Sequence, residues 1–258
     1  MALNWIEEGG QVLIQGASRG IGLELVRQSL EQPRAGCVWA SCRAPEQATA
    51  LHELADRNPE RLRLLKLDVT DEATMAAAAD RLREAGARLQ LIVHASGVLH
   101  ERNRRVRPEK RLEELNLEAL TYLFQVNAAG PILATRYLLP LVHPEAPAAV
   151  AAISARVGSI GDNRKGGWYG YRASKAALNQ FMHTLAIELQ RRAPNVTCLT
   201  LHPGTTDTDL SRPFQAWVPA EQLFATERTA AQLLAVIDGC PTEESGSFFS
   251  WDGQRIPW

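Results

Sequence analysis

The chain has 258 residues, of which 45% are hydrophobic and 22% charged, and its formal net charge at pH 7 is −1. A near-neutral chain of ordinary composition is not expected to take nucleic acid or an acidic membrane surface as its main partner. No stretch approaches the roughly 18 uninterrupted apolar residues of a transmembrane helix, and the N-terminal residues lack the pattern of a secretory signal.

The four cysteines are scattered and show no metal-ligand spacing, so we expect reduced thiols, no metal site and a cytoplasmic protein. The basic run at residues 100–110 is interpreted as a solvated loop rather than a polyanion site. One α/β domain can reach this length, and no linker, repeat or low-complexity segment divides the sequence, so a single domain over residues 1–258 is predicted.

Short apolar runs alternate along the chain with longer amphipathic segments. Strands are predicted over residues 11–16, 37–42, 61–69, 88–97, 148–154, 195–204 and 245–251. Helices are predicted over residues 21–30, 46–57, 71–86, 117–142 and 226–238, and over a segment that carries Tyr171 and ends near residue 192. This alternation predicts βαβ units. The expected architecture is an α/β Rossmann fold, a seven-stranded, mostly parallel, doubly wound sheet with helices on both faces.

Three glycines, Gly16, Gly20 and Gly22, follow the first predicted strand and open the first predicted helix. Glycines at such a turn let backbone N–H groups approach a pyrophosphate at the positive end of a helix. A three-glycine turn alone is a weak signal, but its position between a strand and a helix supports the prediction of a dinucleotide site.

Two arginines indicate which dinucleotide is expected. Arg19 lies inside the turn, and Arg43 follows the second strand, where an acidic residue would bind a ribose 2′-hydroxyl. Each arginine alone is equally well explained as a solvated surface charge. Because Cys42 and Arg43 occupy that place, and because two guanidinium groups can clamp a 2′-phosphate, NADP(H) is predicted rather than NAD.

Tyr171 and Lys175 lie four residues apart in the segment YGYRASKAALNQF. Positions i and i+4 share a helix face, so the Lys175 ammonium is expected beside the Tyr171 phenol. A neighbouring cation lowers the pKa of a phenol from about 10 and makes it a usable general acid or base. A solvated tyrosine beside a lysine is the alternative, but the glycine-rich stretch before the pair favours the catalytic interpretation.

These motifs resemble the short-chain dehydrogenase/reductase family over almost the full length of the chain. QGASRGIG is similar to the family's glycine turn, LDVTD to its adenine-contacting segment, VHASG to its NNAG element and QVNAAGP to the segment with its helix-bulge asparagine. Within the family, SARVGSIGDN, GGWYGYRASKAALN and the ending FFSWDGQRIPW resemble the C-factor and sniffer carbonyl-reductase branch.

The resemblance implies hydride transfer between a nicotinamide and a carbonyl carbon, with Tyr171 exchanging the proton at oxygen and Lys175 binding the nicotinamide ribose. It implies that Asn127 positions Lys175 through its backbone and a water. The implied cofactor-binding residues are Gly16, Ser18, Arg19, Gly20, Ile21, Gly22, Arg43, Asp68, Val69, His94, Ala95, Ser96, Gly97, Tyr171, Lys175, Pro203, Gly204, Thr206 and Thr208.

One position departs from the family pattern. The catalytic serine usually stands three residues before the glycine that follows the fifth strand, and counting back from Gly158 gives Ala155, with Ser154 one place early. Side chains alternate along a strand, so Ser154 should point away from the site if the strand is regular there. Three possibilities stay open: a distorted turn lets Ser154 serve, Ser159 or a water substitutes, or the enzyme is slow. His94 is a further candidate donor, with a structural role as the alternative.

Residues 209–225 follow the sixth strand, at the carboxyl edge of the sheet where ligands bind. They are predicted to form either a lid over a moderately apolar substrate or an ordinary packed connection. The apolar side chains concerned are Phe214, Trp217, Val218, Leu223 and Phe224, with Pro213 and Pro219 as stiffening residues. The C-terminal aromatic residues are expected to pack against the body or a second subunit; they are Phe248, Phe249, Trp251 and Trp258.

Two hypotheses about function follow, from different classes. The first is an NADPH-dependent oxidoreductase that reduces the carbonyl of a small, moderately apolar aldehyde or ketone, or runs the reverse oxidation. The second is an NADP(H)-binding regulatory or cell-signalling protein with little catalysis, which Ala155 and the C-factor resemblance favour. An isomerase or lyase on the same fold is a third possibility. The resemblance also implies a homodimer or homotetramer formed through the helices that carry Asn127 and Tyr171.

Overall fold

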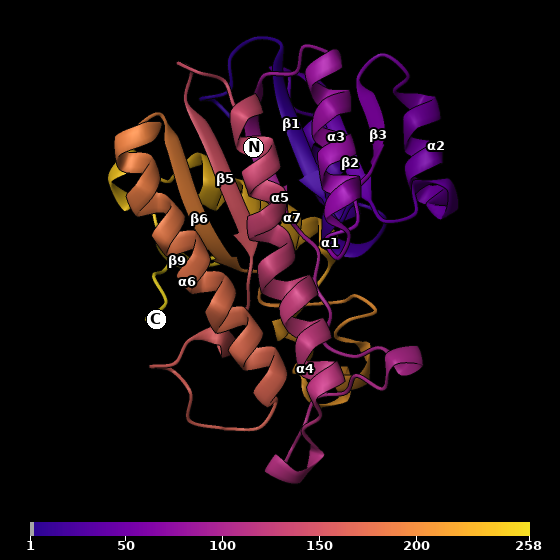
Figure 1. Ribbon diagram of the computed structural model, residues 1–258, viewed down its shortest axis with the longest axis vertical. Helices are drawn as coiled ribbons and strands as arrows, with labels where there is room; N and C mark the ends of the chain where they lie inside the picture. The colour runs from indigo at the N-terminus through magenta and orange to yellow at the C-terminus, as the bar shows by residue number, and fades with distance from the viewer. Residues whose placement is uncertain (1–2) are drawn as a thin grey trace.

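The computed structural model describes residues 3–258, in which strands and helices alternate as predicted (Figure 1). The strands are β1 (Gly10–Gln15), β2 (Ala35–Cys42), β3 (Leu62–Lys66), β4 (Leu89–His94), β5 (Ala148–Ile153), β6 (Val196–His202), β7 (Thr205–Thr206), β8 (Leu223–Phe224) and β9 (Ser247–Ser250). The α-helices are α1 (Gly20–Leu30), α2 (Thr49–Arg57), α3 (Glu72–Glu84), α4 (Leu117–Phe124), α5 (Gly130–Leu138), α6 (Tyr169–Arg192) and α7 (Thr226–Asp238).

Seven strands form one sheet in the order β3-β2-β1-β4-β5-β6-β9, and each neighbouring pair is parallel. The predicted doubly wound Rossmann architecture is therefore confirmed. The strand order reverses between β1 and β4, which creates a crevice at the carboxyl ends of these strands. The short strands β7 and β8 pair with each other outside this sheet and were not predicted.

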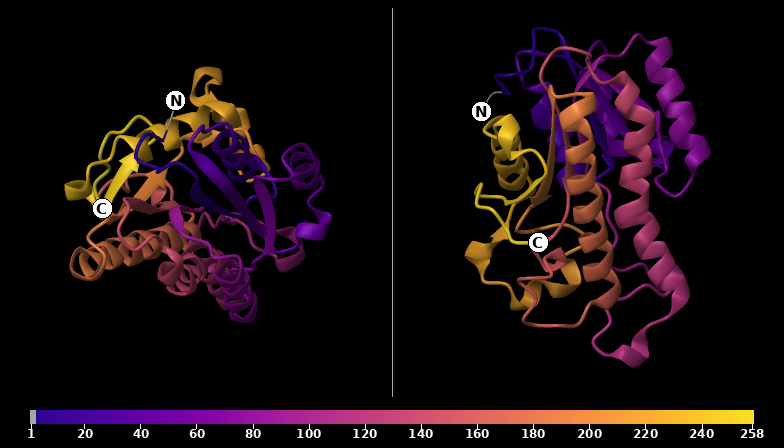
Figure 2. Two further views of the ribbon diagram at one scale, coloured as in Figure 1. Left: turned by 90° about the horizontal axis from the view of Figure 1, so that it is seen from above. Right: turned by 60° about the vertical axis from the view of Figure 1, so that its left-hand side comes forward.

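Helices cover both faces of the sheet, giving the three layers seen in Figure 2. Alternation along β1 shows how the sequence builds them, because Leu13 joins the core on one face while Val12 and Ile14 join the core on the other. The first core also takes apolar side chains from α3, α5 and α6, and the second takes them from α1, α2 and α7.

The helix predicted over residues 117–142 is interrupted. A five-residue π-helical turn, Gln125–Ala129, separates α4 from α5, and the chain leaves α5 through a short 3₁₀ turn. Gly130 follows the π turn and packs so closely on Val69 that a Cβ atom there would lie 2.5 Å from the Val69 carbonyl oxygen. Pro131 falls in the first turn of α5, a position where a helix tolerates proline.

The C-terminal aromatic residues pack against the body of the protein, one of the two alternatives. Phe248 is buried and its ring stacks on that of Trp258 with centroids 5.8 Å apart. The Trp258 carbonyl oxygen accepts a hydrogen bond from the backbone of Gly161. The end of the chain therefore supports the loop that follows β5.

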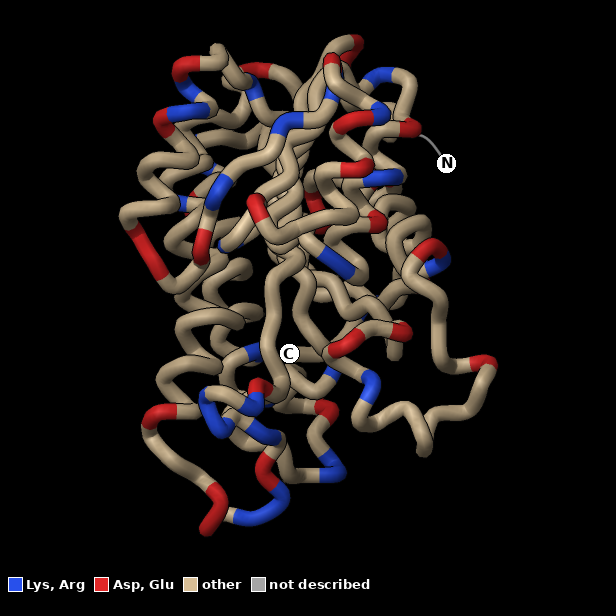
Figure 3. Tube along the Cα trace, turned by 90° about the vertical axis from the view of Figure 1, so that its right-hand side faces the viewer, with Lys and Arg blue, Asp and Glu red and all other residues tan. Residues whose placement is uncertain are grey.

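Acidic and basic residues are interspersed along the trace (Figure 3). The basic side chains of residues 100–110 are exposed, which fits a solvated loop; they are Arg102, Arg104, Arg105, Arg107 and Lys110. Glu109 is the buried charged residue of this run. Within residues 3–258, no helix is long and apolar enough to cross a membrane, and the four cysteines are free thiols.

Candidate active site

A cavity of about 1220 Å³ opens at the carboxyl ends of the strands, at the switch point between β1 and β4. Nearly all of the predicted site residues line it: Gly16, Ser18, Arg19, Gly20, Ile21, Gly22, Arg43, Asp68, Val69, Ala95, Ser96, Gly97, Ser154, Ala155, Tyr171, Lys175, Pro203, Gly204, Thr206 and Thr208. His94 and Asn127 are not among the lining residues, although Asn127 bonds to Val98, which is.

The glycine turn between β1 and α1 can only be built from glycine at two positions. Gly16 has φ +85°, and a Cβ atom on it would lie 2.6 Å from the backbone nitrogen of Ser96. A Cβ on Gly22 would lie 2.2 Å from the Gly16 carbonyl oxygen. These contacts bring the turn, the start of α1 and the end of β4 together beside the cavity. Backbone N–H groups at the start of a helix can bind a pyrophosphate in such an arrangement.

A second part of the cavity follows β2 and β3. Asp68 is held by its own turn, because its Oδ1 accepts hydrogen bonds from the Thr70 backbone and hydroxyl at 2.8 and 2.7 Å. Arg43 lies exposed at the end of β2, beside the same cavity. Arg104 and Tyr122, which were not predicted from the sequence, also line this end of the cavity. The guanidinium of Arg104 lies 4.4 Å from the centroid of the Tyr122 ring.

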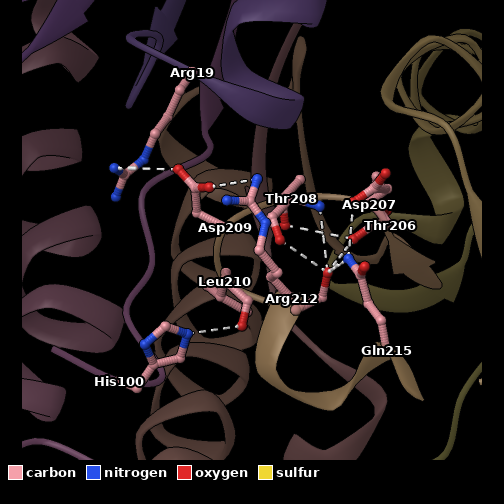
Figure 4. A network of polar contacts seen from close by, with 10 residues as sticks. Arg19, His100, Thr206, Asp207, Thr208, Asp209, Leu210, Arg212 and Gln215 are labelled. Carbon is pink, nitrogen blue, oxygen red and sulfur yellow. Dashed lines mark hydrogen bonds and ion pairs between the residues drawn. The ribbon is translucent and has the colours of Figure 1, made fainter. Parts of the chain in front are cut away.

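The segment after β6 reaches the glycine turn through an ion pair. A carboxylate oxygen of Asp209 lies 3.6 Å from Arg19 Nη1, and the other lies 2.8 Å from Arg212 Nη2 (Figure 4). The hydroxyl of Ser211 fixes this segment by donating to the Thr206 carbonyl at 2.5 Å. Arg19 is therefore shared with a carboxylate that the sequence analysis did not identify.

Tyr171 and Lys175 lie in the first two turns of α6, with exposed fractions of 7% and 2%. Lys175 Nζ donates to the carbonyl oxygen of Ile153 at 2.8 Å and lies 5.9 Å from the centroid of the Tyr171 ring. The two side chains share one face of the helix, as their spacing predicts. A solvated pair, the alternative, does not fit this burial.

Burial dominates the protonation of this pair. It raises the pKa of the Tyr171 phenol above its ordinary value and lowers the pKa of Lys175 to about 7. The prediction that Lys175 lowers the phenol pKa is therefore wrong for the protein alone. The phenolate of Tyr171 would lose its hydration, and this raises the phenol pKa. Attraction to Lys175 does not compensate, because burial also disfavours the ammonium form of Lys175.

Asn127 lies in the π-helical turn, so the predicted helix-bulge asparagine is found in a real helix irregularity. Its side chain is fully buried; Oδ1 accepts from the Val98 backbone N–H at 2.8 Å, and Nδ2 donates to the Val98 carbonyl and the Ser174 hydroxyl. A Cβ placed on Gly97 would lie 3.6 Å from both Asn127 Oδ1 and Lys175 Nζ. Asn127 thus joins the end of β4 to α6 directly behind Lys175.

The serine position shows no free hydroxyl donor. Ala155 follows β5 in an extended conformation and lines the cavity. The buried Ser154 hydroxyl donates to Asn179 Oδ1 at 2.6 Å, and the buried Ser159 hydroxyl donates to the Pro257 carbonyl at 2.5 Å. Because a hydroxyl has one proton to donate, neither serine can polarise a substrate carbonyl in this arrangement. The geometry favours the two remaining possibilities, a water or a slow enzyme.

His94 takes the structural role rather than the role of a donor to the cofactor. It is buried at the end of β4, and its Nε2 lies 2.8 Å from Thr135 Oγ1. Thr135 Oγ1 donates its own proton to the Pro131 carbonyl, so Nε2 is the protonated nitrogen of a neutral ring. The prediction that His94 binds the cofactor is not supported, because the ring points into the α5 side of the core.

His94 should also make stability depend on pH. Burial lowers the pKa of His94 to about 4, so between about pH 6.5 and 4 the unfolded chain binds a proton that the folded chain does not. Stability therefore falls as the pH decreases through this window. We expect His94→Gln to remove about 2 kcal/mol of the loss between pH 7 and pH 5, measured as the free energy of unfolding in urea. Equal losses in the variant and the parent would contradict this assignment.

Aromatic side chains form the end of the cavity next to Tyr171. The Trp168 ring lies 6.2 Å from the Tyr171 ring and 5.0 Å from the Phe214 ring, centroid to centroid. His100 lies 6.1 Å from Phe214, and its Nε2 is 3.2 Å from the Leu210 carbonyl. Trp168 and His100 were not predicted, although Trp168 stands in the glycine-rich block directly before Tyr171.

The two interpretations of residues 209–225 each hold for part of the segment. Its first half contains a 3₁₀ turn, Arg212–Trp217. Apolar side chains of this turn and of the residue after it line the cavity, as a lid would: Phe214, Trp217 and Val218. In its second half Phe224 is buried against Trp251, with ring centroids 4.8 Å apart, as in ordinary packing. The first half is therefore the candidate wall of a substrate site.

A parallel doubly wound sheet, a glycine turn at its switch point and a buried Tyr–Lys pair in the same cavity define an oxidoreductase of the dinucleotide-binding α/β class. Residues 11–219 match the short chain dehydrogenase family. The chain belongs to this family.

Similar proteins include a dehydrogenase, a carbonyl reductase and C-signal. The chain is 32% identical to 1-hydroxy-2-glutathionyl-2-methyl-3-butene dehydrogenase of Rhodococcus sp. (strain AD45) over 96% of this chain and 99% of that protein. It is 35% identical to C-signal of Myxococcus xanthus over 57% of this chain and 83% of C-signal. The structure of NADPH-bound carbonyl reductase from chicken fatty liver matches with a TM-score of 0.85 and 27% identity, covering 98% of this chain and 100% of that chain. The predicted resemblance to the C-factor and carbonyl-reductase branch is confirmed.

Proposed function

We propose that the protein is an NADPH-dependent reductase of small, moderately apolar aldehydes or ketones, with the reverse alcohol oxidation as the same reaction run backwards. The buried Tyr171–Lys175 pair carries the proposal, because it lies in one cavity with a turn built to approach a pyrophosphate. The aromatic wall of Trp168 and Phe214 next to Tyr171 supports an apolar substrate.

In this proposal three residues of the site have defined roles. Tyr171 gives its phenolic proton to the carbonyl oxygen during reduction and takes it back during oxidation. Lys175 binds the nicotinamide ribose, and Asn127 holds the backbone behind it. When bound, the cofactor supplies the hydride, and its phosphates favour the ammonium form of Lys175. The low exposed fraction of Tyr171, 7%, limits the access of bulk water to the proton that is transferred.

Arg19 and Arg43 support the choice of NADP(H), as does the chicken carbonyl reductase with its bound NADPH. We expect Arg43→Ala to raise the Kd of NADPH about tenfold, through loss of a charge-assisted contact to the 2′-phosphate. The Kd of NADH should not change.

Asp209→Asn should act in the opposite direction and lower the Kd of NADPH about twofold to fivefold, because Arg19 no longer has a competing carboxylate.

Fluorescence titration of both nucleotides measures these constants. Arg57→Ala, at the exposed end of α2 and outside the cavity, is the matched control. A parallel loss of NADPH and NADH affinity in Arg43→Ala would show that the arginine does not select the 2′-phosphate.

A second candidate function is an NADP(H)-binding regulatory or cell-signalling protein with little catalysis. Ala155 at the serine position favours it, as do the two neighbouring serines whose protons are already donated. The similarity to C-signal supports the same alternative. Its expected property is tight NADPH binding without turnover.

The test is oxidation of NADPH by the purified protein, followed at 340 nm over a broad set of aldehydes, ketones and diketones. Turnover with an apolar carbonyl compound, abolished by Tyr171→Phe, is the expected result. Tight NADPH binding without turnover over the whole set would reject the reductase and favour the regulatory function.

The four free thiols support the expected cytoplasmic location. We propose a homodimer or homotetramer whose contact is formed by the helical segment that carries Asn127, from α4 to α5, and by α6. These helices expose the apolar side chains Phe124, Phe181 and Ile187. Light scattering after gel filtration gives the oligomeric state.

A further inference from the structure

The helix that carries Tyr171 and Lys175 has an unusual start. Trp168, the residue at its N-cap, adopts a left-handed conformation with φ 54° and offers no side-chain hydrogen bond to the first turn. Gly166 and Gly167 before it are also left-handed. A large residue in this conformation is strained and persists only where neighbouring groups hold it.

Glu109, from the loop between β4 and α4, makes two hydrogen bonds with the start of α6. Its carbonyl oxygen accepts a hydrogen bond from the Trp168 backbone N–H at 2.5 Å. Its carboxylate accepts one from the backbone N–H of Gly170 at 3.2 Å. The carboxylate thus accepts from a first-turn N–H group that has no partner within the helix and that the side chain of the N-cap residue would ordinarily bind.

The burial of Glu109 shows that this contact is specific. Its exposed fraction is 2%, whereas the basic residues around it in the same loop are exposed. A buried carboxylate is stable only where hydrogen bonds or positive charge replace its hydration, and the N-terminal end of the 24-residue helix α6 provides both.

Gly170 is the counterpart of Glu109. A Cβ atom on Gly170 would lie 2.9 Å from Glu109 Oε1 and 2.6 Å from Leu123 Cδ1. The absence of a side chain at this position is therefore what lets the carboxylate reach the helix. Tyr171 is the next residue, so whatever fixes the Gly170 backbone also fixes the start of the Tyr171 side chain.

We propose that Glu109 is a positioning residue for proton transfer. Through Gly170 and Trp168 it holds the first turn of α6. The Tyr171 side chain and the Trp168 ring, which forms a wall of the substrate site, therefore keep a fixed position relative to each other. The inference rests on the proposed role of Tyr171 as proton donor, but it adds a residue from a distant loop on which that role depends.

The test compares Glu109→Ala, Glu109→Gln and Gly170→Ala with the parent protein, with Glu113→Gln in the same loop as the exposed control. In Glu109→Ala we expect kcat to fall about tenfold or more, because a small displacement of the proton donor is costly. The Kd of NADPH should stay within about twofold, since the glycine turn is untouched. Amide exchange in residues 169–173, followed by mass spectrometry, should become about tenfold faster as the cap is lost.

The conservative variant separates positioning from folding. Glu109→Gln keeps an oxygen that can accept from Gly170, so kcat and amide exchange should stay within about threefold of the parent. Gly170→Ala should lower kcat and speed amide exchange as much as Glu109→Ala does. The variant with both substitutions should have a kcat no lower than that of either single variant. If Glu109→Ala does not fold, Glu109→Asp, which withdraws the carboxylate by one methylene, is expected to show the lowered kcat instead.

Unchanged kcat in a folded Glu109→Ala whose first-turn amides exchange faster would overturn the positioning role while leaving the proposed function intact. Unchanged exchange would overturn the cap itself. Absence of turnover in the parent protein, or full turnover in Tyr171→Phe, would overturn the proposed function and the positioning role together.

Discussion

Tyr171→Phe is expected to lower kcat for carbonyl reduction by at least about 10²-fold, because the variant lacks the proton that must reach the carbonyl oxygen. The phenol lies buried in the cavity, where bulk water cannot easily replace it as a donor. The Kd of NADPH should be nearly unchanged, since the glycine turn and the arginines, which we propose bind the other end of the cofactor, are not altered. Steady-state turnover and fluorescence titration on the same preparation measure the two quantities.

Tyr169→Phe is the matched control, because Tyr169 lies in the same helical turn but is 43% exposed and outside the cavity lining. It should keep full activity. Retention of more than about a third of kcat in Tyr171→Phe would remove Tyr171 from the proton-transfer step and would point to a water or another side chain.

Ala155→Ser is expected to raise kcat about tenfold to a hundredfold by adding a hydrogen-bond donor for the substrate carbonyl. Ala155 lines the cavity in an extended conformation, while the neighbouring hydroxyls of Ser154 and Ser159 are committed elsewhere. The gain should appear in kcat rather than in KM, because the added bond strengthens as negative charge develops on the oxygen.

Ser154→Ala provides the complementary measurement. Its hydroxyl donates to Asn179, so its removal should change stability more than kcat. No gain in Ala155→Ser together with a large loss in Ser154→Ala would show that Ser154 turns into the site when substrate binds. A gain only in Ala155→Ser would mean that the natural protein has a weakened site, as a signalling role would allow.

The fold could be predicted from the sequence because its signals are local. Short apolar runs that alternate with amphipathic segments predict a parallel sheet, and the glycines directly after the first run predict a phosphate-binding turn. The spacing of Tyr171 and Lys175 likewise fixes a shared helix face, which the structure confirms.

The parts that could not be predicted depend on contacts between distant segments. The π turn at Asn127 arises where Gly130 packs on Val69, about sixty residues earlier in the chain. The raised pKa of Tyr171 is a consequence of burial, which spacing along a helix does not report. The pairing of Asp209 with Arg19 and the capping by Glu109 join loops that only the folded sheet brings together.

The aromatic wall has a consequence for how new specificities can arise. Phe214 and Val218 come from a surface connection after β6, whereas Tyr171, the proposed proton donor, belongs to helix α6. Substitutions in this connection can therefore change which molecules are accepted without altering the chemistry. Grafting residues 209–219 from a relative is a direct route to an enzyme with a different substrate range.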